Sequence, residues 1–125
     1  MDPWTRRKNP LTPAELAATP LVQREPTSGT RIALEKALRN YTLAAPALEL
    51  STASAVRGAA AAGVAPTVLS NLAIGDDLSA GRLVEIPVTD IDLSRRLRAI
   101  WPRGQQPTGP ARDLLSLIGR SRPAQ

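Results

Sequence analysis

The sequence predicts an α/β fold in which a mainly parallel sheet is covered by helices on both faces. Short apolar segments alternate with helical patterns along the first half of the 125-residue chain, as in β–α–β units whose strands run parallel. Proline, glycine and hydroxyl residues stand where helices should begin and end. The composition, 42% hydrophobic and 22% charged, is typical of a globular chain with one core of modest size.

The first helix is predicted directly after Thr12. This residue can cap it, Pro13 suits its first position, and Glu15 can return a hydrogen bond to the cap. Thr19-Pro20 stops the helix, and a short strand follows over 21–23. After a polar loop over 24–30, a second helix is predicted over roughly 30–40 by apolar residues at helical spacing, namely Leu34, Ala37, Leu38 and Tyr41.

The middle of the chain repeats the strand–helix–strand order. Residues 47–50 form the next strand candidate, and Ser51-Thr52 caps a helix over 53–62 that Gly63 closes. A third apolar run covers 64–69. Because proline cannot donate to a strand ladder, Pro66 should lie at a strand start, an edge or a bulge.

The remaining elements are predicted from weaker patterns. Ser70 begins a short helical turn that reaches Ile74, and Gly75-Asp76-Asp77 forms a turn. Alternating residues over 83–87 indicate a half-buried strand, and a second strand is predicted at about 95–101. The last helix should cover 110–118 and end at Gly119.

The residue content argues against an enzyme and against a cofactor. The chain has no cysteine and no histidine, so it offers no disulfide, no thiolate and no imidazole ligand or base. The carboxylate pairs Asp76-Asp77 and Asp90/Asp92 stand on predicted turns without a nucleophile beside them. The glycines do not form a phosphate loop. We therefore expect no metal site and no catalytic residue.

The net charge of +5 does not by itself indicate nucleic-acid binding. The arginines are spread along the chain, their densest groups being Arg6-Arg7-Lys8, Arg95–Arg98 and Arg120/Arg122, and aromatic residues are few. We expect no direct DNA binding by this chain. The sequence also shows no apolar run of membrane-spanning length and no secretory signal, so we expect a cytoplasmic protein without a membrane partner.

The predicted sheet suggests where a ligand would bind. In parallel sheets ligands lie outside the carboxyl ends of the strands, which here are the loop at 25–30, the corner at 51–52 and the stretch after Val64. These stretches are small and hydroxyl-rich. Free backbone N–H groups at a helix start would suit a carboxylate or another anion, although helix capping alone explains the same residues.

The ordered set of segments resembles LysR-type transcriptional regulators, in the second half of their effector-binding domain. The resemblance covers nearly the whole chain. It rests on the stretch from Leu11 to Arg31, on Leu48–Thr52 followed by Ala61–Gly63, on Gly63–Ser70, on the "L-x-x-G-x-L-V" turn at Leu78–Val84, on Arg95–Trp101, and on the C-terminal helix. The chain departs from the family pattern at Ala65 and Ser70, where glycine and proline are frequent.

The resemblance implies one subdomain of a periplasmic-binding-protein-like (type 2) fold. In this family two such subdomains clasp a small effector, and binding alters transcription. The chain would be the effector-sensing part of a regulator, without the winged helix-turn-helix and the first effector subdomain. The alternative is a stand-alone small-molecule-binding protein derived from the same fold.

By the resemblance, individual residues are expected to form the effector site and the dimer interface. We expect ligand contacts from three segments: Thr27, Ser28 and Thr30; Glu49, Ser51 and Thr52; Pro66 and Thr67. The helix matching 53–62 lies at a dimer interface in the family, which assigns Ala53, Val56, Arg57 and Ala60 to a homo-oligomer contact. The same alanine-rich face would equally suit packing on the chain's own sheet.

The resemblance also divides the chain into three parts. Residues 1–11 would be a linker after the crossover between subdomains, and residues 12–94 the second effector-binding subdomain. The strand and helix within 95–125 would return to the other subdomain. Because their apolar residues would lack that partner here, we expect the isolated chain to self-associate.

Overall fold

The computed structural model describes residues 3–120 and divides into two compact units, Met1–Ser94 and Arg95–Gln125. Residues 1–2 and 121–125, the outer ends of the predicted linker and of the predicted C-terminal part, lie outside the described residues. The first unit contains both strands and four of the α-helices, and the second contains the last helix.

The sheet is parallel, as predicted. Strand β1 (Val22–Arg24) pairs in parallel with β2 (Leu48–Leu50), with Val22 opposite Leu48. Val22 also forms a parallel bridge with Thr67, and its amide donates to the carbonyl of Pro66 at 2.9 Å. Pro66 therefore accepts from β1 and donates nothing, as expected of a proline at a strand start. The third predicted strand is reduced to this bridge.

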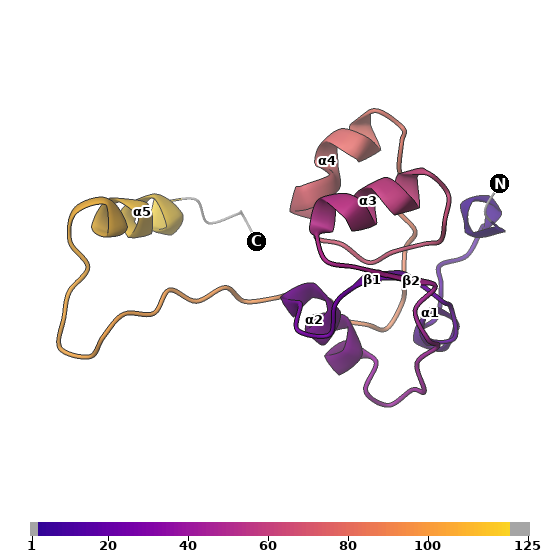
Figure 1. Cartoon of the computed structure of the whole chain (residues 1–125), viewed down its shortest axis with the longest axis horizontal. Helices are drawn as coiled ribbons and strands as arrows, with labels where there is room; N and C mark the ends of the chain where they lie inside the picture. Colours follow the sequence, from indigo (N-terminus) through magenta and orange to yellow (C-terminus); the bar gives the residue numbers. More distant parts are fainter. Residues whose placement is uncertain (1–2, 121–125) are drawn as a thin grey trace. The chain divides into compact units, whose positions relative to one another are not determined.

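Helices lie on both sides of the strands. Figure 1 shows α3 (Ala53–Ala61) and α4 (Asn71–Ser79) on one side, and α1 (Pro13–Ala17) and α2 (Gly29–Ala37) on the other. This arrangement confirms the predicted α/β class. Among the described residues, no helix is both long enough and apolar enough to cross a lipid bilayer.

The core lies in the first unit and joins α1, α2 and the start of β1. It is a cluster of five buried residues, Leu16, Ala17, Leu21, Leu34 and Leu38. Trp4, Leu43, Val68, Val88, Ile91 and Leu93 pack against it. Burying one leucine side chain stabilises a fold by roughly 1.5–3 kcal/mol, so this small cluster is a main source of stability for the unit.

Several helix ends lie where the capping residues of the sequence predict them. The Thr12 side chain accepts from the Glu15 amide while Glu15 accepts from the Thr12 amide, which is the predicted capping box of α1. Thr52 caps α3 by accepting from the Ala55 amide at 3.1 Å. Gly63 follows α3 with a φ of +79°, a conformation that glycine adopts without strain.

Helix α4 differs from the prediction because tertiary ion pairs hold a sequence that looks like a turn. It begins with Asn71, runs through Gly75 and ends at Ser79, instead of stopping at Ile74. The Asp77 carboxylate is buried and pairs with Arg57 of α3 at 3.2 Å and with Arg82 at 2.6 Å. These two contacts outweigh the turn tendency of the Gly-Asp-Asp sequence.

The strand predicted over 83–87 is absent for a local reason. The amides of Arg82 and Leu83 donate to the carbonyl of Asp77 and so complete the end of α4 rather than a strand ladder. Pairing is confined to the end of this segment, where Val88 bridges Leu11 and the Pro87 carbonyl accepts from the Leu11 amide at 2.9 Å. The predicted strand at 95–101 is also wrong: these residues have no ladder partner in the described chain and form no regular structure.

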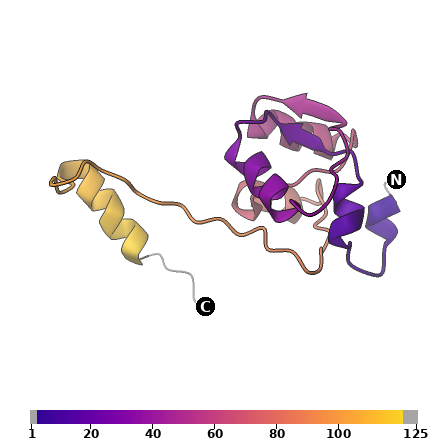
Figure 2. The same cartoon turned by 90° about the horizontal axis from the view of Figure 1, so that it is seen from below.

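The segment predicted as a linker belongs to the first unit. It contains a short 3-10 helix, η1 (Pro3–Arg6), and Leu11 is only 1% exposed. The bridge from Leu11 to Val88 fixes the end of this segment against residues far along the chain. In the second unit, Figure 2 shows α5 (Gly109–Arg120) as one continuous helix, which passes Gly119 by one residue.

Candidate functional site

The parallel register brings the candidate effector residues to one end of the sheet. Arg24 and Leu50 are partners in the register, so the chain leaves β1 and β2 at the same edge. The loop of residues 25–28 leads from β1 into α2, and Ser51-Thr52 leads from β2 into α3. Two of the three predicted segments therefore lie together where the parallel sheet places a ligand.

The predicted hydroxyls differ in how far the fold already uses them. Thr52 is occupied as the cap of α3, and the Thr67 hydroxyl donates to the carbonyl of Val22 at 2.8 Å. Ser28 is the buried N-cap residue of α2 but makes no side-chain capping bond. Thr27 and Ser51 are exposed and Thr30 is half-buried. Ser28, Thr27, Thr30 and Ser51 thus remain as candidate donors to a ligand.

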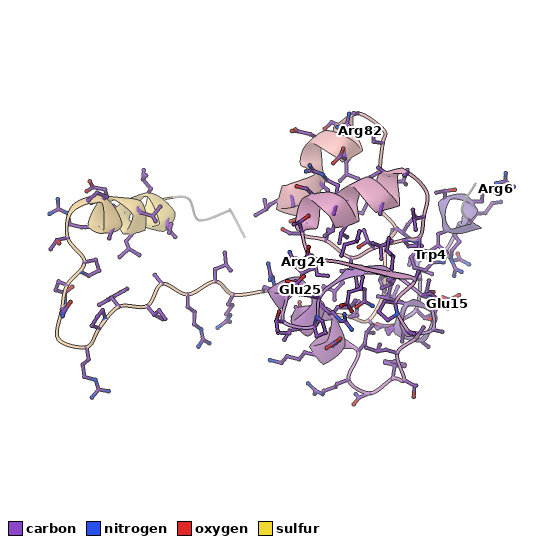
Figure 3. All side chains as sticks on the ribbon, viewed as in Figure 1. Trp4, Arg6, Glu15, Arg24, Glu25 and Arg82 are labelled. Carbon is purple, nitrogen blue, oxygen red and sulfur yellow. The ribbon has the colours of Figure 1, made fainter. Side chains whose placement is uncertain are left out.

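Two arginines that the sequence reasoning did not select dominate the electrostatics of this edge. Arg24 donates to both carboxylate oxygens of Glu25, at 2.8 Å each, and this contact lowers the pKa of Glu25. Figure 3 shows the two labelled side chains together beside α2. Arg31 donates to Glu35 and to Glu49, both at 2.8 Å, and these bonds raise its pKa. Both guanidinium groups are therefore matched by carboxylates of the chain itself.

Glu49, expected as a ligand contact, is an ion-pair partner in this structure. Its carboxylate is exposed at the surface of β2 and accepts from Arg31. A ligand that bound Glu49 would have to replace a charge-assisted hydrogen bond. Pro66 is half-buried and its carbonyl is used by Val22.

The cavity at this edge is too small for an effector. It has a volume of about 10 Å³ and is lined by residues of β1, α2 and α3, among them Gln23, Thr30 and Arg31. That is room for about one water molecule, whereas small-molecule sites measure roughly 300–1,000 Å³. A ligand bound by these residues would sit on the open edge of the sheet and not inside the unit.

Gln23 is a third residue of this edge that was not predicted from the sequence. Its Oε1 atom is buried and has no hydrogen-bond partner among the described residues. The side chain lines the 10 Å³ cavity. No sequence signal distinguishes it, because an isolated glutamine in a short strand is ordinary. Arg31 had a faint signal in the sequence, since Arg31 and Glu35 stand one helical turn apart.

The candidate dimer residues of α3 fall into two groups. Val56 is only 1% exposed, so its side chain is buried within its own unit. Arg57 is engaged with Asp77 and with the carbonyl of Ala73. Ala53 is exposed and Ala60 half-buried, and these two small residues remain on the accessible side of the helix.

Another hollow lies away from the sheet edge. It is a groove of about 230 Å³ between residues 4–10 and residues 84–87. Arg7, which lines it, is held by Glu15 at 2.9 Å. Within residues 3–120, no group of three or more acidic side chains gathers as a metal site.

Comparison with known proteins gives consistent results along almost the entire chain. A family model described as the LysR substrate binding domain matches residues 2–122. An uncharacterised HTH-type transcriptional regulator of Mycobacterium tuberculosis is 51% identical over 121 residues, covering 92% of this chain and 39% of that protein. A Mycobacterium bovis protein of the same description matches to the same extent.

A more distant relative has a more informative name. The RuBisCO operon transcriptional regulator of Acidithiobacillus ferrooxidans is 33% identical over 105 residues, covering 83% of this chain and 34% of that protein. The chain thus spans between a third and two fifths of the length of these relatives.

Proposed function

Because this chain belongs to the family of LysR substrate-binding domains, we propose that it senses a small effector for a transcriptional regulator. The observation that supports this most directly is the parallel register of β1 and β2, which brings residues 25–30 and Ser51-Thr52 to one sheet edge. The ligand would be held by hydroxyl and backbone N–H donors at this edge, with a small carboxylate as the favoured class.

We propose further that the chain is neither an enzyme nor a direct DNA-binding module. The mycobacterial and Acidithiobacillus relatives are described as transcriptional regulators. The basic side chains of this chain are spread along the sequence, and Arg7, Arg24 and Arg31 are paired with its own carboxylates. The protein would act in the cytoplasm and as a homo-oligomer, with Ala53 and Ala60 of α3 at a contact between copies. The exposed and half-buried positions of these two alanines support that assignment.

The effector proposal is tested by titrating the isotope-labelled chain with small carboxylates and following its amide resonances. We expect weak binding, since the edge encloses no ligand-sized cavity. The shifts should centre on residues 27–30 and 51–52. Thr27→Val, which replaces an exposed hydroxyl by a methyl group, should weaken binding several-fold.

Thr42→Val is the matched control, since Thr42 is also exposed but lies in the loop after α2. Binding should be unchanged in this variant. Shifts restricted to other regions, such as the groove beside Arg7, would contradict the assignment of the sheet edge.

A further inference from the structure

Arg31 is the most highly connected side chain at the edge of the sheet. Its Nη1 atom donates to the carbonyl oxygen of Arg24 at 2.9 Å and to Oε2 of Glu49 at 2.8 Å, and its Nε atom donates to Oε1 of Glu35 at 2.8 Å. The side chain is only 14% exposed. One guanidinium group therefore contacts β1, β2 and its own helix at once.

These contacts hold both ends of the loop of residues 25–28, which carries Thr27 and Ser28 and leads to Thr30 in the first turn of α2. The loop starts after Arg24, whose carbonyl is bound by Arg31, and it ends where α2 begins, two residues before Arg31. The Ser28 amide donates to the carbonyl of Glu25 at 3.0 Å, so the loop itself is a tight turn. The hydrogen bond between Arg31 and Glu49 links the start of α2, where this loop ends, to β2.

We propose that Arg31 is a positioning residue of the effector edge and that Glu49 is its counter-ion rather than a ligand contact. This inference rests on the proposed function for its significance, but the geometry of the loop is independent of any ligand. The pair connects α2 to β2 and thereby fixes the loop of residues 25–28 beside Ser51-Thr52. A ligand would meet donors already held in place, which reduces the entropy lost on binding.

The chemistry of the guanidinium group explains why an arginine is required. It presents several N–H donors in a rigid plane and can serve three acceptors in different directions, whereas a lysine ammonium is a compact charge on a flexible stem. Arg31→Lys keeps the charge but cannot reproduce the three contacts. Glu49→Gln keeps the size and one acceptor oxygen but loses the charge.

The test is amide hydrogen exchange on the full 125-residue chain without ligand. In Arg31→Lys and Glu49→Gln, the amides of Ser28 and Ile32 should exchange roughly tenfold faster, because local opening of the loop becomes easier. The Val22 amide, which is bonded to Pro66 inside the sheet, should keep its exchange rate. Arg39→Lys, at an exposed arginine just after α2, is the matched control and should change nothing.

The double variant, Arg31→Lys with Glu49→Gln, tests whether the two residues act through the same contact. Its loop exchange should be no faster than that of Arg31→Lys alone. Unchanged exchange at Ser28 in Arg31→Lys would overturn the proposal, as would equal acceleration at Ser28 and Val22, which would mean general destabilisation. If Arg31→Lys accelerates exchange at Ser28 and Glu49→Gln does not, Glu49 is not the residue through which Arg31 acts. Failure of every carboxylate to bind would count against the effector function and leave the loop result standing.

Discussion

Thr12 and Glu15 exchange hydrogen bonds at the start of α1, and Arg7 holds the same glutamate from outside the helix at 2.9 Å. Thr12→Ala removes the cap of a helix that carries two core residues, Leu16 and Ala17. We expect the free energy of unfolding to fall by about 1 kcal/mol. Urea denaturation followed by circular dichroism measures this change. Thr42→Ala, at an exposed loop hydroxyl, should alter stability little, and equal losses in both variants would exclude the cap as the cause.

The carboxylates predict how stability depends on pH. The Thr12 amide, followed by Arg7, lowers the pKa of Glu15, and Arg24 lowers the pKa of Glu25. A pKa that is lower in the folded state means that the unfolded state binds more protons in acid. The resulting stabilisation is complete above the ordinary glutamate value of about 4.3 and is lost as pH falls below it.

We therefore expect constant urea midpoints between about pH 6 and 8, where histidine ordinarily titrates but this chain has none. As the pH drops below about 4.3, the urea midpoint should decrease, and Glu15→Gln should make that decrease less steep. Acid titration of the two proteins in parallel provides the measurement. A urea midpoint that stays constant throughout the acid range would contradict this prediction. It would mean that these carboxylates have the same pKa in the folded and the unfolded state.

The residues that could be predicted from the sequence are those whose contacts are local. Thr12 and Glu15 stand three positions apart, and the pattern that joins them is visible in the sequence itself. Arg31 and Glu49 stand 18 positions apart, so their contact exists only once β2 has paired with β1. The hydroxyls at the sheet edge were found by a rule about strand ends, which does not reveal that Thr52 and Thr67 are already used by the backbone.

At the scale of elements, α3 offers a paired test of what a glycine contributes. Gly58 lies within the helix with open space around its missing Cβ, while Gly63 follows the helix with a φ of +79°. Gly58→Ala should stabilise the protein by up to about 1 kcal/mol. Gly63→Ala should destabilise it by about 1–2 kcal/mol, because an L-residue is strained in that conformation. Thermal unfolding of the two variants measures both signs, and a shift in the same direction would contradict this description of the helix end.

The wrongly predicted elements are segments that lack a strand partner or that form contacts with another segment which the sequence does not reveal. Residues 83–87 have the alternation of a strand, but the amide of Leu83, like that of Arg82 before it, donates to the carbonyl of Asp77 at the end of α4. Residues 70–74 are predicted as a short helical turn and residues 75–77 as a turn, but Asp77 lies within α4 and pairs with Arg57 and Arg82. Periodicity predicts the conformation a segment can adopt, whereas pairing depends on what the remainder of the chain places beside it.

At the scale of the whole molecule, the second unit exposes much of its apolar surface. Leu114, Leu117 and Ile118 of α5 are each 58–60% exposed, and Leu97 and Ile100 about 90%. Such surfaces drive association, so the apparent mass of the chain should rise with concentration in light scattering. A variant with Leu114→Glu and Ile118→Glu should remain monomeric. Ser116→Glu, at an exposed polar position of the same helix, is the control, and a concentration-independent mass for the original chain would contradict the prediction.

The division into two units has a practical consequence for spectroscopy. The chain has two tryptophans, and each unit contains one. Trp4 packs against the core of the first unit, while Trp101 is 49% exposed in the second. Indole emission shifts to shorter wavelength when the ring leaves water, so Trp4→Phe leaves a fluorophore that reports association of the second unit. Trp101→Phe leaves one that reports unfolding of the first. Native fluorescence can therefore follow association and unfolding separately. If both variants gave the same response to dilution and to urea, the two units would not behave independently.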